Sequence, residues 1–193
     1  QFLNDFPYVN GGLFKDFHKA PKFTRRSRQV ILECGELSWS EINPDIFGSM
    51  IQAVITPEHR GGMGMHYTSV PNIMKVIEPL FLNDLYESFD DSKGNIKKLN
   101  DLLRRLWNIK IFDPACGSGN FLIISYKELR KLEMLIFQEI DKVSKTYTNQ
   151  FTGITLNNFF GIELDDFAHE VAILSLLVCA IILQKVPIKI KKK

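Results

Sequence analysis

The architecture of this chain can be predicted from one stretch, Ile111-Phe112-Asp113-Pro114-Ala115-Cys116-Gly117-Ser118-Gly119-Asn120-Phe121-Leu122. A short apolar run, from Ile109 to Phe112, leads to an acidic residue, a turn of small residues and a helical pattern that begins at Phe121. Strand, glycine-rich turn and helix in this order form the first half of a nucleotide-binding βαβ unit. The two glycines can adopt positive φ and let a ligand approach the backbone. Asp113 follows the strand at its carboxyl end, where open α/β sheets bind ligands.

A Gly-x-Gly pair alone is also common in ordinary turns, because glycine interrupts elements of every kind. The string from Asp113 to Leu122 is more specific. It resembles the S-adenosylmethionine-binding motif of the amino-methylating DNA methyltransferases, which has the form Asp-Pro-x-Cys-Gly-Ser-Gly-x-Phe-Leu. The resemblance implies cofactor contacts from most of the loop, namely Asp113, Pro114, Ala115, Cys116, Gly117, Gly119, Asn120 and Phe121. For the Cys116 side chain itself, packing under the turn is a better interpretation than nucleophilic chemistry.

A second segment with this resemblance lies upstream, at His66-Tyr67-Thr68-Ser69. The residues alone predict a helix start, because Thr and Ser cap helices and Pro71 suits a first turn. The same letters resemble the family's amino-terminal cofactor motif, usually Gly-x-[His/Phe]-[Tyr/Phe]-Thr-[Pro/Ser]. The resemblance implies that Tyr67, Thr68 and Ser69 lie against the methionine end of the cofactor, where helix N–H groups suit a carboxylate.

A third segment, Phe159 to Leu164, is predicted to be a second buried strand that ends in an acid. A carboxylate in this position binds ribose hydroxyls in nucleotide-binding folds. Glu163 follows Gly119 by 44 residues (163 − 119), more than the usual spacing of about twenty, which fits a long first helix. The alternative is that Glu163 caps the next helix. Gly-Ile-Glu-x-Asp also resembles the family's second motif, which implies that Glu163 and Leu164 contact the cofactor.

Composition indicates one folded domain, since the chain has 193 residues, 45% of them hydrophobic. A net charge of +2 gives no overall nucleic-acid signature, although Lys19, Lys22, Arg25, Arg26 and Arg28 form a local basic cluster that suits either phosphates or solvent. Three distant cysteines predict neither disulfides nor a zinc site, which fits a reducing cytoplasm. The four histidines show no ligand spacing, so no metal is expected. The chain begins with Gln and lacks a signal peptide, and we interpret it as a segment of a larger prokaryotic, cytoplasmic protein.

The predicted fold class is α/β and helix-rich, a partial Rossmann-like, doubly wound sheet of the class I methyltransferase type, preceded by a helical subdomain. Residues 1–62 are predicted to form a helical and loop connector, and residues 63–193 the cofactor-binding part of the methyltransferase domain. A proline, Pro79, is expected to kink the helix after Ser69 near Glu78. The helix from Phe121 to about Ile140 is expected to carry a solvated face that includes Arg130 and Glu133. The apolar helix from 166 to 184 is interpreted as a core helix or subunit contact, too short to span a membrane.

The sequence contains no Pro-Pro pair. The family's acceptor motif, [Asp/Asn/Ser]-Pro-Pro-aromatic, holds the target amine and stacks on a flipped base. We therefore assign no catalytic residue and expect the chain alone to be inactive. Phe6-Pro7-Tyr8-Val9-Asn10-Gly11-Gly12 also resembles a segment that precedes the methyltransferase domain in fused, type IIG-like restriction-modification enzymes.

These resemblances imply a parent protein that is an adenine-specific DNA methyltransferase using S-adenosyl-L-methionine and acting on double-stranded DNA. Alternatives are a non-catalytic cofactor- or DNA-binding module, and an RNA or protein amide methyltransferase. Self-association is also expected, because half of a doubly wound sheet leaves apolar surface uncovered.

Overall fold

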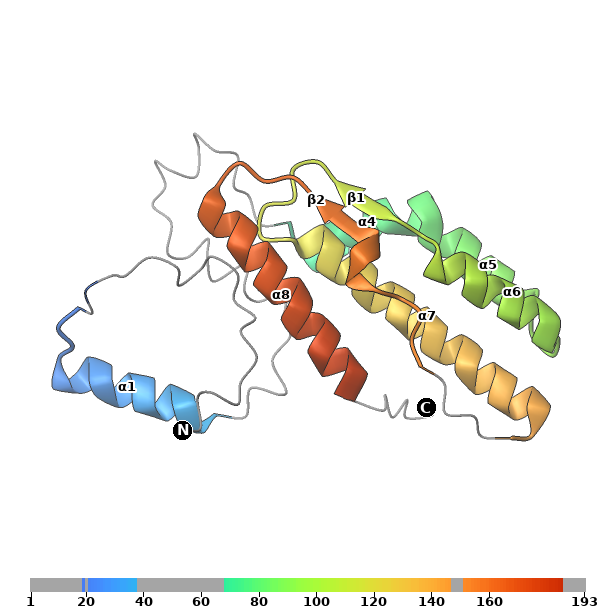
Figure 1. Cartoon of the computed structure of the whole chain (residues 1–193), viewed down its shortest axis with the longest axis horizontal. Helices are drawn as coiled ribbons and strands as arrows, with labels where there is room; N and C mark the ends of the chain where they lie inside the picture. The colour runs from blue at the N-terminus through green and yellow to red at the C-terminus, as the bar shows by residue number, and fades with distance from the viewer. Residues whose placement is uncertain (1–18, 20, 38–67, 147–150, 186–193) are drawn as a thin grey trace.

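The computed structural model describes residues 19, 21–37, 68–146 and 151–185 (Figure 1). Its elements are α1 (Arg25–Glu36), α4 (Val70–Ile77), η3 (Glu78–Leu82), α5 (Asn83–Asp90), α6 (Ile96–Trp107), β1 (Ile111–Asp113), α7 (Asn120–Ser144), η4 (Leu156–Asn158), β2 (Phe159–Gly161) and α8 (Asp166–Lys185). The predicted amino-terminal loop, the boundary at residue 62, Tyr67 and the carboxyl-terminal tail lie outside the described residues.

The sheet consists of β1 and β2, which run parallel with Ile111 opposite Phe159 and Asp113 opposite Gly161. Helix α7 connects them, and Figure 1 shows it lying beneath both strands. The predicted βαβ unit is therefore confirmed. Both strands have three residues and are shorter than their apolar runs suggested. Parallel strands need a crossover connection, and α7 with the segment after it supplies one.

The helical region before β1 changes character at Pro79, as predicted. Helix α4 ends at Ile77, and Glu78–Leu82 form one π-helical turn, η3, before α5 continues. Proline has no backbone N–H, and its ring clashes with the carbonyl four residues earlier, so a wider turn relieves the conflict. Asn83 then donates its N–H to the Glu78 carbonyl across this turn.

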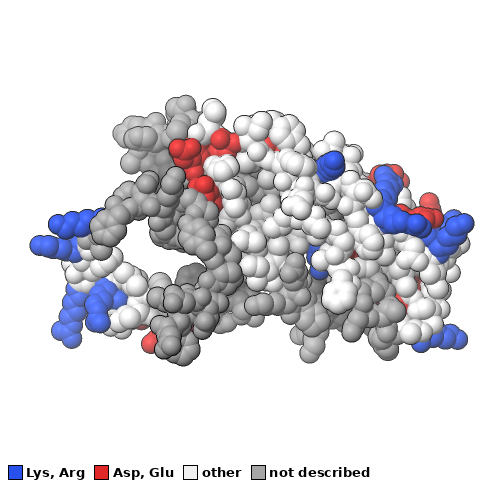
Figure 2. All heavy atoms as spheres, in the orientation of Figure 1, with Lys and Arg blue, Asp and Glu red and all other residues white. Residues whose placement is uncertain are grey.

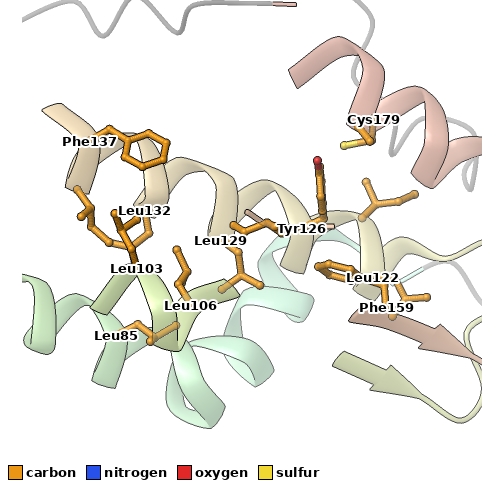
Figure 3. Close-up of a cluster of buried hydrophobic side chains, with 14 of the residues drawn as sticks. Leu85, Leu103, Leu106, Leu122, Tyr126, Leu129, Leu132, Phe137, Phe159 and Cys179 are labelled. Atoms are coloured by element: carbon orange, nitrogen blue, oxygen red, sulfur yellow. The ribbon is translucent and has the colours of Figure 1, made fainter. Parts of the chain in front are cut away.

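The hydrophobic core is built around α7 (Figure 3). Tyr126, Leu129 and Leu132 are at most 1% exposed. Figure 3 shows side chains of α6 and α8 reaching α7 from different sides. The Tyr126 ring meets Phe159 of β2 edge-on, with 5.4 Å between ring centroids. These contacts place the start of α7, and hence the preceding loop, against the ends of both strands.

The predicted solvated face of α7 is wrong at two positions. Glu133 is fully buried and Arg130 is 6% exposed, and the two side chains form an ion pair. Glu133 Oε1 also accepts hydrogen bonds from Trp107 Nε1 at 2.6 Å, Thr152 Oγ1 at 3.1 Å and the Gly153 N–H at 3.0 Å. The end of α6 and the segment before β2 cover this face, which helical periodicity could not predict. Desolvation lowers the pKa of the Arg130 guanidinium from its usual range.

Helix α8 spans Asp166–Lys185 and packs against α7 and η4. Its part from Asp166 to Leu183 is long and apolar enough to cross a membrane, so length alone does not exclude a span, contrary to the sequence argument. One face of α8 is enclosed by the core. The enclosed residues are Ala168, Val171, Ala172, Ser175, Leu176, Cys179 and Ala180. This arrangement supports the interpretation as a core helix.

Candidate functional site

The loop between β1 and α7 is folded by backbone hydrogen bonds that extend the parallel pairing. Ile162 donates its N–H to the Asp113 carbonyl at 3.0 Å, and Cys116 donates to the Ile162 carbonyl at the same distance. The Asp113 carboxylate accepts from the Ala115 N–H at 3.1 Å, which closes a local turn. The segments after β1 and β2 are thus held side by side at the carboxyl edge of the sheet.

The Glu163 carboxylate joins the two loops directly. Its Oε2 accepts from the Gly117 N–H at 2.8 Å. Its Oε1 accepts from the N–H groups of Leu164 at 2.8 Å and Asp165 at 2.9 Å. Glu163 is therefore not the cap of α8: that role belongs to Asp165, whose Oδ1 accepts from the Ala168 N–H at 2.7 Å. A half-buried carboxylate lies between the glycine-rich loop and the end of β2.

Both loop glycines have positive φ, as expected, but for different structural reasons. Gly117 has φ +53° and open space where a Cβ would stand. Gly119 has φ +84°, and a Cβ there would lie 3.1 Å from Ala172 Cβ on α8. The open side of the loop is therefore at Gly117, whereas Gly119 lets α7 and α8 approach each other.

Cys116 lies on the packed underside of this loop. It is 9% exposed, and a Cβ on Gly161 would come within 2.7 Å of its Sγ. Burial raises the pKa of the Cys116 thiol to about 11, and the nearby Asp113 and Glu163 carboxylates add to the shift. The thiol is thus protonated at neutral pH, which suits packing rather than nucleophilic chemistry.

The first turn of α7 offers polar groups toward the loop. Gly119 is its N-cap residue and has no side chain to cap the first N–H groups of this 25-residue helix. Asn120 is 6% exposed, and its Oδ1 has no hydrogen-bond partner. Phe121 is half-buried and packs against the cluster formed by α4 and α7. Helix N–H groups without a side-chain cap and an unsatisfied amide oxygen are both groups that a polar ligand would satisfy.

The upstream segment comes close to the same region through α4. Ser69 is the N-cap residue of α4, Thr68 precedes it, and both are half-buried. Helix α4 packs against α7, with Ile73 and Ile77 against Ile124. The described residues of the predicted site therefore lie near the start of α7, with Pro114 and Ala115 exposed on the loop and Leu164 96% exposed beyond β2.

A groove with a volume of about 590 Å³ runs alongside β1 and reaches the loop at Asp113 and Pro114. Apolar side chains of α4, η3 and β1 form most of its wall, together with Phe121 and Ser125 of α7. Leu80 and Phe112 are 72% and 60% exposed there. This is the uncovered apolar surface that the predicted self-association requires, and self-association remains a prediction.

The electrostatic environment of the loops is acidic. Figure 2 shows acidic side chains gathered near the start of α8, and the two strand ends carry Asp113, Glu163, Asp165 and Asp166. No three His, Cys, Asp or Glu side chains form a possible metal site in the part of the chain that the structure describes. The sequence analysis did not identify Asp165 as the N-cap residue of α8. The signal was present, because an Asp stands two residues after Glu163 and directly before the helical pattern.

The family comparison agrees with this geometry. A family model described as MmeI, DNA-methyltransferase domain, matches residues 89–192, more than half of the chain. The chain belongs to the MmeI DNA-methyltransferase domain family. The match includes α6, β1, α7, β2 and α8, and therefore both loops of the candidate site.

Individual relatives extend the likeness upstream. The chain is 57% identical over 176 residues to DNA methyltransferase A of Bacillus subtilis, covering 91% of the chain and 20% of that protein. It is 31% identical over 219 residues to a putative type II restriction enzyme and methyltransferase of Methanocaldococcus jannaschii, covering 91% of the chain and 18% of that protein. The chain thus spans about a fifth of the length of these curated relatives.

A solved structure shows the same architecture. The type IIL restriction-modification enzyme MmeI, in complex with DNA, matches with a TM-score of 0.79 and 37% identity. The match covers 94% of this chain and 24% of that one. The relatives are DNA methyltransferases and restriction-modification enzymes from bacteria and archaea, which supports a methyltransferase parent for this chain.

Proposed function

We propose that this chain binds S-adenosyl-L-methionine and forms the cofactor-binding part of a cytoplasmic, site-specific DNA methyltransferase. The acceptor, in the longer parent protein, is the exocyclic amine of adenine in double-stranded DNA. The observation that carries the proposal is the Glu163 carboxylate at the end of β2, bonded across to Gly117 in the loop after β1. This pair lies at the carboxyl edge of a parallel sheet, where nucleotide-binding folds bind their ligands. The acid can accept hydrogen bonds from ribose hydroxyls, and the glycine lets the ligand approach the backbone.

The charges and free groups of the site suit this cofactor. S-adenosylmethionine carries a sulfonium and an ammonium group, and both favour the acidic surroundings of Asp113 and Glu163. Its carboxylate suits the uncapped first turn of α7. The unsatisfied Asn120 Oδ1 is an acceptor for an ammonium or hydroxyl donor. Open space at Gly117 leaves room for close approach to the backbone.

The capacity of Glu163 limits how a ribose can bind. A carboxylate has about four lone-pair positions, and three backbone N–H groups already occupy Glu163. One further hydrogen-bond donor fits without rearrangement. For Glu163 to accept from two ribose hydroxyls, one of its hydrogen bonds from a backbone N–H would have to break. Leu164, which is 96% exposed beside this carboxylate, offers an apolar surface for a base.

In the reaction, the bound cofactor supplies an electrophilic methyl group on sulfur. The chain's own residues contribute position: Glu163 and Asp113 hold the two loops together, and α7 fixes the loop against the core. Alignment of this kind lowers the barrier without a general acid or base. None of the candidate residues is assigned a catalytic role.

The remaining predictions belong to the same proposal. The βαβ unit forms part of a Rossmann-like, doubly wound methyltransferase sheet, and the methyltransferase region begins near residue 63. Because the sequence has no Pro-Pro pair, the acceptor-binding motif comes from another part of the parent protein, and this chain by itself transfers no methyl group.

Cofactor binding is tested by isothermal titration of S-adenosylmethionine into the chain. Glu163→Gln and Asp113→Asn are each expected to weaken binding at least roughly tenfold, since each replaces a charged acceptor in a hydrogen-bonded site. Asp166→Asn is the matched control: it removes one nearby exposed charge and is expected to change affinity less than about threefold. Equal losses of cofactor affinity in Asp166→Asn and Glu163→Gln would show that only the total negative charge matters, and would contradict a specific role for Glu163.

Methyl transfer is tested with the intact parent protein and radiolabelled cofactor. The expected result is label on adenine of plasmid DNA. Label on RNA or on a protein amide would replace the DNA assignment, and no transfer to any acceptor would favour a non-catalytic module.

A further inference from the structure

We infer that the basic patch at the start of α1 and in the segment just before it is a DNA-binding surface that contacts the phosphate backbone. The basic patch consists of Lys19, Lys22, Arg25, Arg26 and Arg28, five cations among ten residues that contain no acid. This inference goes beyond the cofactor site and rests on the proposed function for its choice of DNA as the partner.

Every residue of the basic patch is exposed, and α1 buries none of its side chains. None of the five cations forms an ion pair with another described residue. By contrast, Lys93 after α5, Arg104 of α6, and Lys131 and Lys142 of α7 each pair with an acid. Figure 2 shows Lys and Arg side chains projecting outward at the start of α1 and at the segment before it. They are therefore available to an external anion.

Helix stability does not explain this arrangement. Thr24 begins α1, since its Oγ1 accepts from the Ser27 N–H at 3.1 Å. Arg25, Arg26 and Arg28 then lie at the positive end of the helix dipole, and Glu36 lies at the negative end. This polarity is the reverse of the one that stabilises helices. The arginines thus cost α1 some stability, which an anionic partner would offset.

The cations of α1 cluster at its start. Arg25, Arg26 and Arg28 lie within its first four residues, whereas Glu33 and Glu36 lie in its second half. A cluster of exposed cations of this kind suits a phosphate backbone or an anionic membrane surface. DNA is favoured because the MmeI structure solved with DNA matches 94% of this chain.

The test measures binding of a DNA duplex of about 30 base pairs to the whole chain by fluorescence anisotropy over a range of salt concentrations. The variant Arg25→Gln/Arg26→Gln/Arg28→Gln is expected to bind roughly 10- to 100-fold more weakly at low salt. The slope of log K against log salt should fall by about 2 to 3, since each phosphate contact contributes about 0.9. Helix content by circular dichroism should be unchanged or higher, because the substitution removes the unfavourable dipole interaction.

The charge-matched control is Lys97→Gln/Lys98→Gln/Arg104→Gln, which removes three exposed cations from α6. It is expected to change DNA affinity less than about threefold. Equal losses in both variants, an unchanged affinity in the α1 variant, or no DNA binding by the unsubstituted chain would each overturn the inference. Tighter, patch-dependent binding to phosphatidylserine vesicles than to DNA would overturn it in favour of a membrane.

Titration of S-adenosylmethionine into the same proteins separates this inference from the proposed function. Cofactor affinity should be equal in the unsubstituted chain and the α1 variant. Patch-dependent DNA binding without cofactor binding supports the inference and contradicts the cofactor proposal. Cofactor binding with patch-independent DNA affinity supports the cofactor proposal and contradicts the inference.

Discussion

Two glutamates near α7 illustrate how the same side chain serves packing in one region and belongs to a proposed ligand site in another. Glu133, midway along the helix, is fully buried and accepts hydrogen bonds from Trp107, Thr152 and Gly153 in addition to its ion pair. Glu163, near the helix start, accepts three backbone N–H groups but stays half-buried beside open loop residues. The enclosed carboxylate can only hold the fold together, whereas the open one can also meet a ligand.

The largest expected effect is at the enclosed carboxylate. Glu133→Ala leaves the Arg130 cation and the Trp107 N–H without their partner inside the core, and should lower the free energy of unfolding by about 3–5 kcal/mol. Glu128→Ala is the control on the same helix, since Glu128 pairs with Lys131 at the surface; its cost should be at most about 1 kcal/mol. Urea unfolding measures both. Similar losses in the two variants would show that burial does not distinguish the pairs.

The second prediction concerns the packed underside of the open loop. At a pH between 9.0, the ordinary pKa of a cysteine thiol, and about 11, the Cys116 thiol stays protonated in the folded state. In the unfolded state the same thiol is deprotonated over this range. Unfolding therefore releases a proton in this range, and the free energy of unfolding should fall by about 2 kcal/mol as pH rises from about 9 to about 11.

The pH dependence is measured by denaturation in the unsubstituted chain and in two variants. Cys116→Ala should remove this part of the pH dependence. Cys34→Ala, at an exposed position, should retain it. Burial also raises the pKa of Tyr126, and that contribution appears equally in all three proteins. A Cys116→Ala variant with the original pH profile would contradict the assignment.

The smallest effect separates the two glycines of the loop. Gly119→Ala places a Cβ 3.1 Å from Ala172 at φ +84° and should cost about 2 kcal/mol of stability. Gly117→Ala has φ +53° but open space, so its cost should be about 1 kcal/mol. Thermal unfolding gives the ranking. A reversed order would place the packed side of the loop at Gly117 instead.

Much of this fold follows from local chemistry. Helix α6 (Ile96–Trp107) is an example, because apolar residues at helical spacing follow an Asn95 cap. The π-helical turn follows from Pro79, whose missing N–H is a property of one residue. The strands were less predictable. Their three-residue lengths depend on which backbone groups find partners, and apolar runs do not encode that.

The candidate site was predicted as a set of residues but not as a set of contacts. From the motif, Glu163 was predicted to bind the hydroxyls of a ribose. Its hydrogen bond with the Gly117 N–H in the glycine-rich loop was not predicted. Periodicity placed Arg130 and Glu133 in solvent, because it describes one helix and ignores its neighbours. Trp107 and Gly153, distant in sequence, bury them.

The amino-acid sequence by itself determined the βαβ unit, the position of its glycine-rich loop, the break at Pro79 and the resemblance to DNA methyltransferases. These depend on residues close together in the chain, whose backbone preferences act locally. Only the tertiary structure decided that Gly119 faces Ala172, that Cys116 lies under the loop against Gly161, and that Glu133 is enclosed while Glu163 remains accessible. Burial depends on what other segments cover a side chain, and that is set when the whole chain packs.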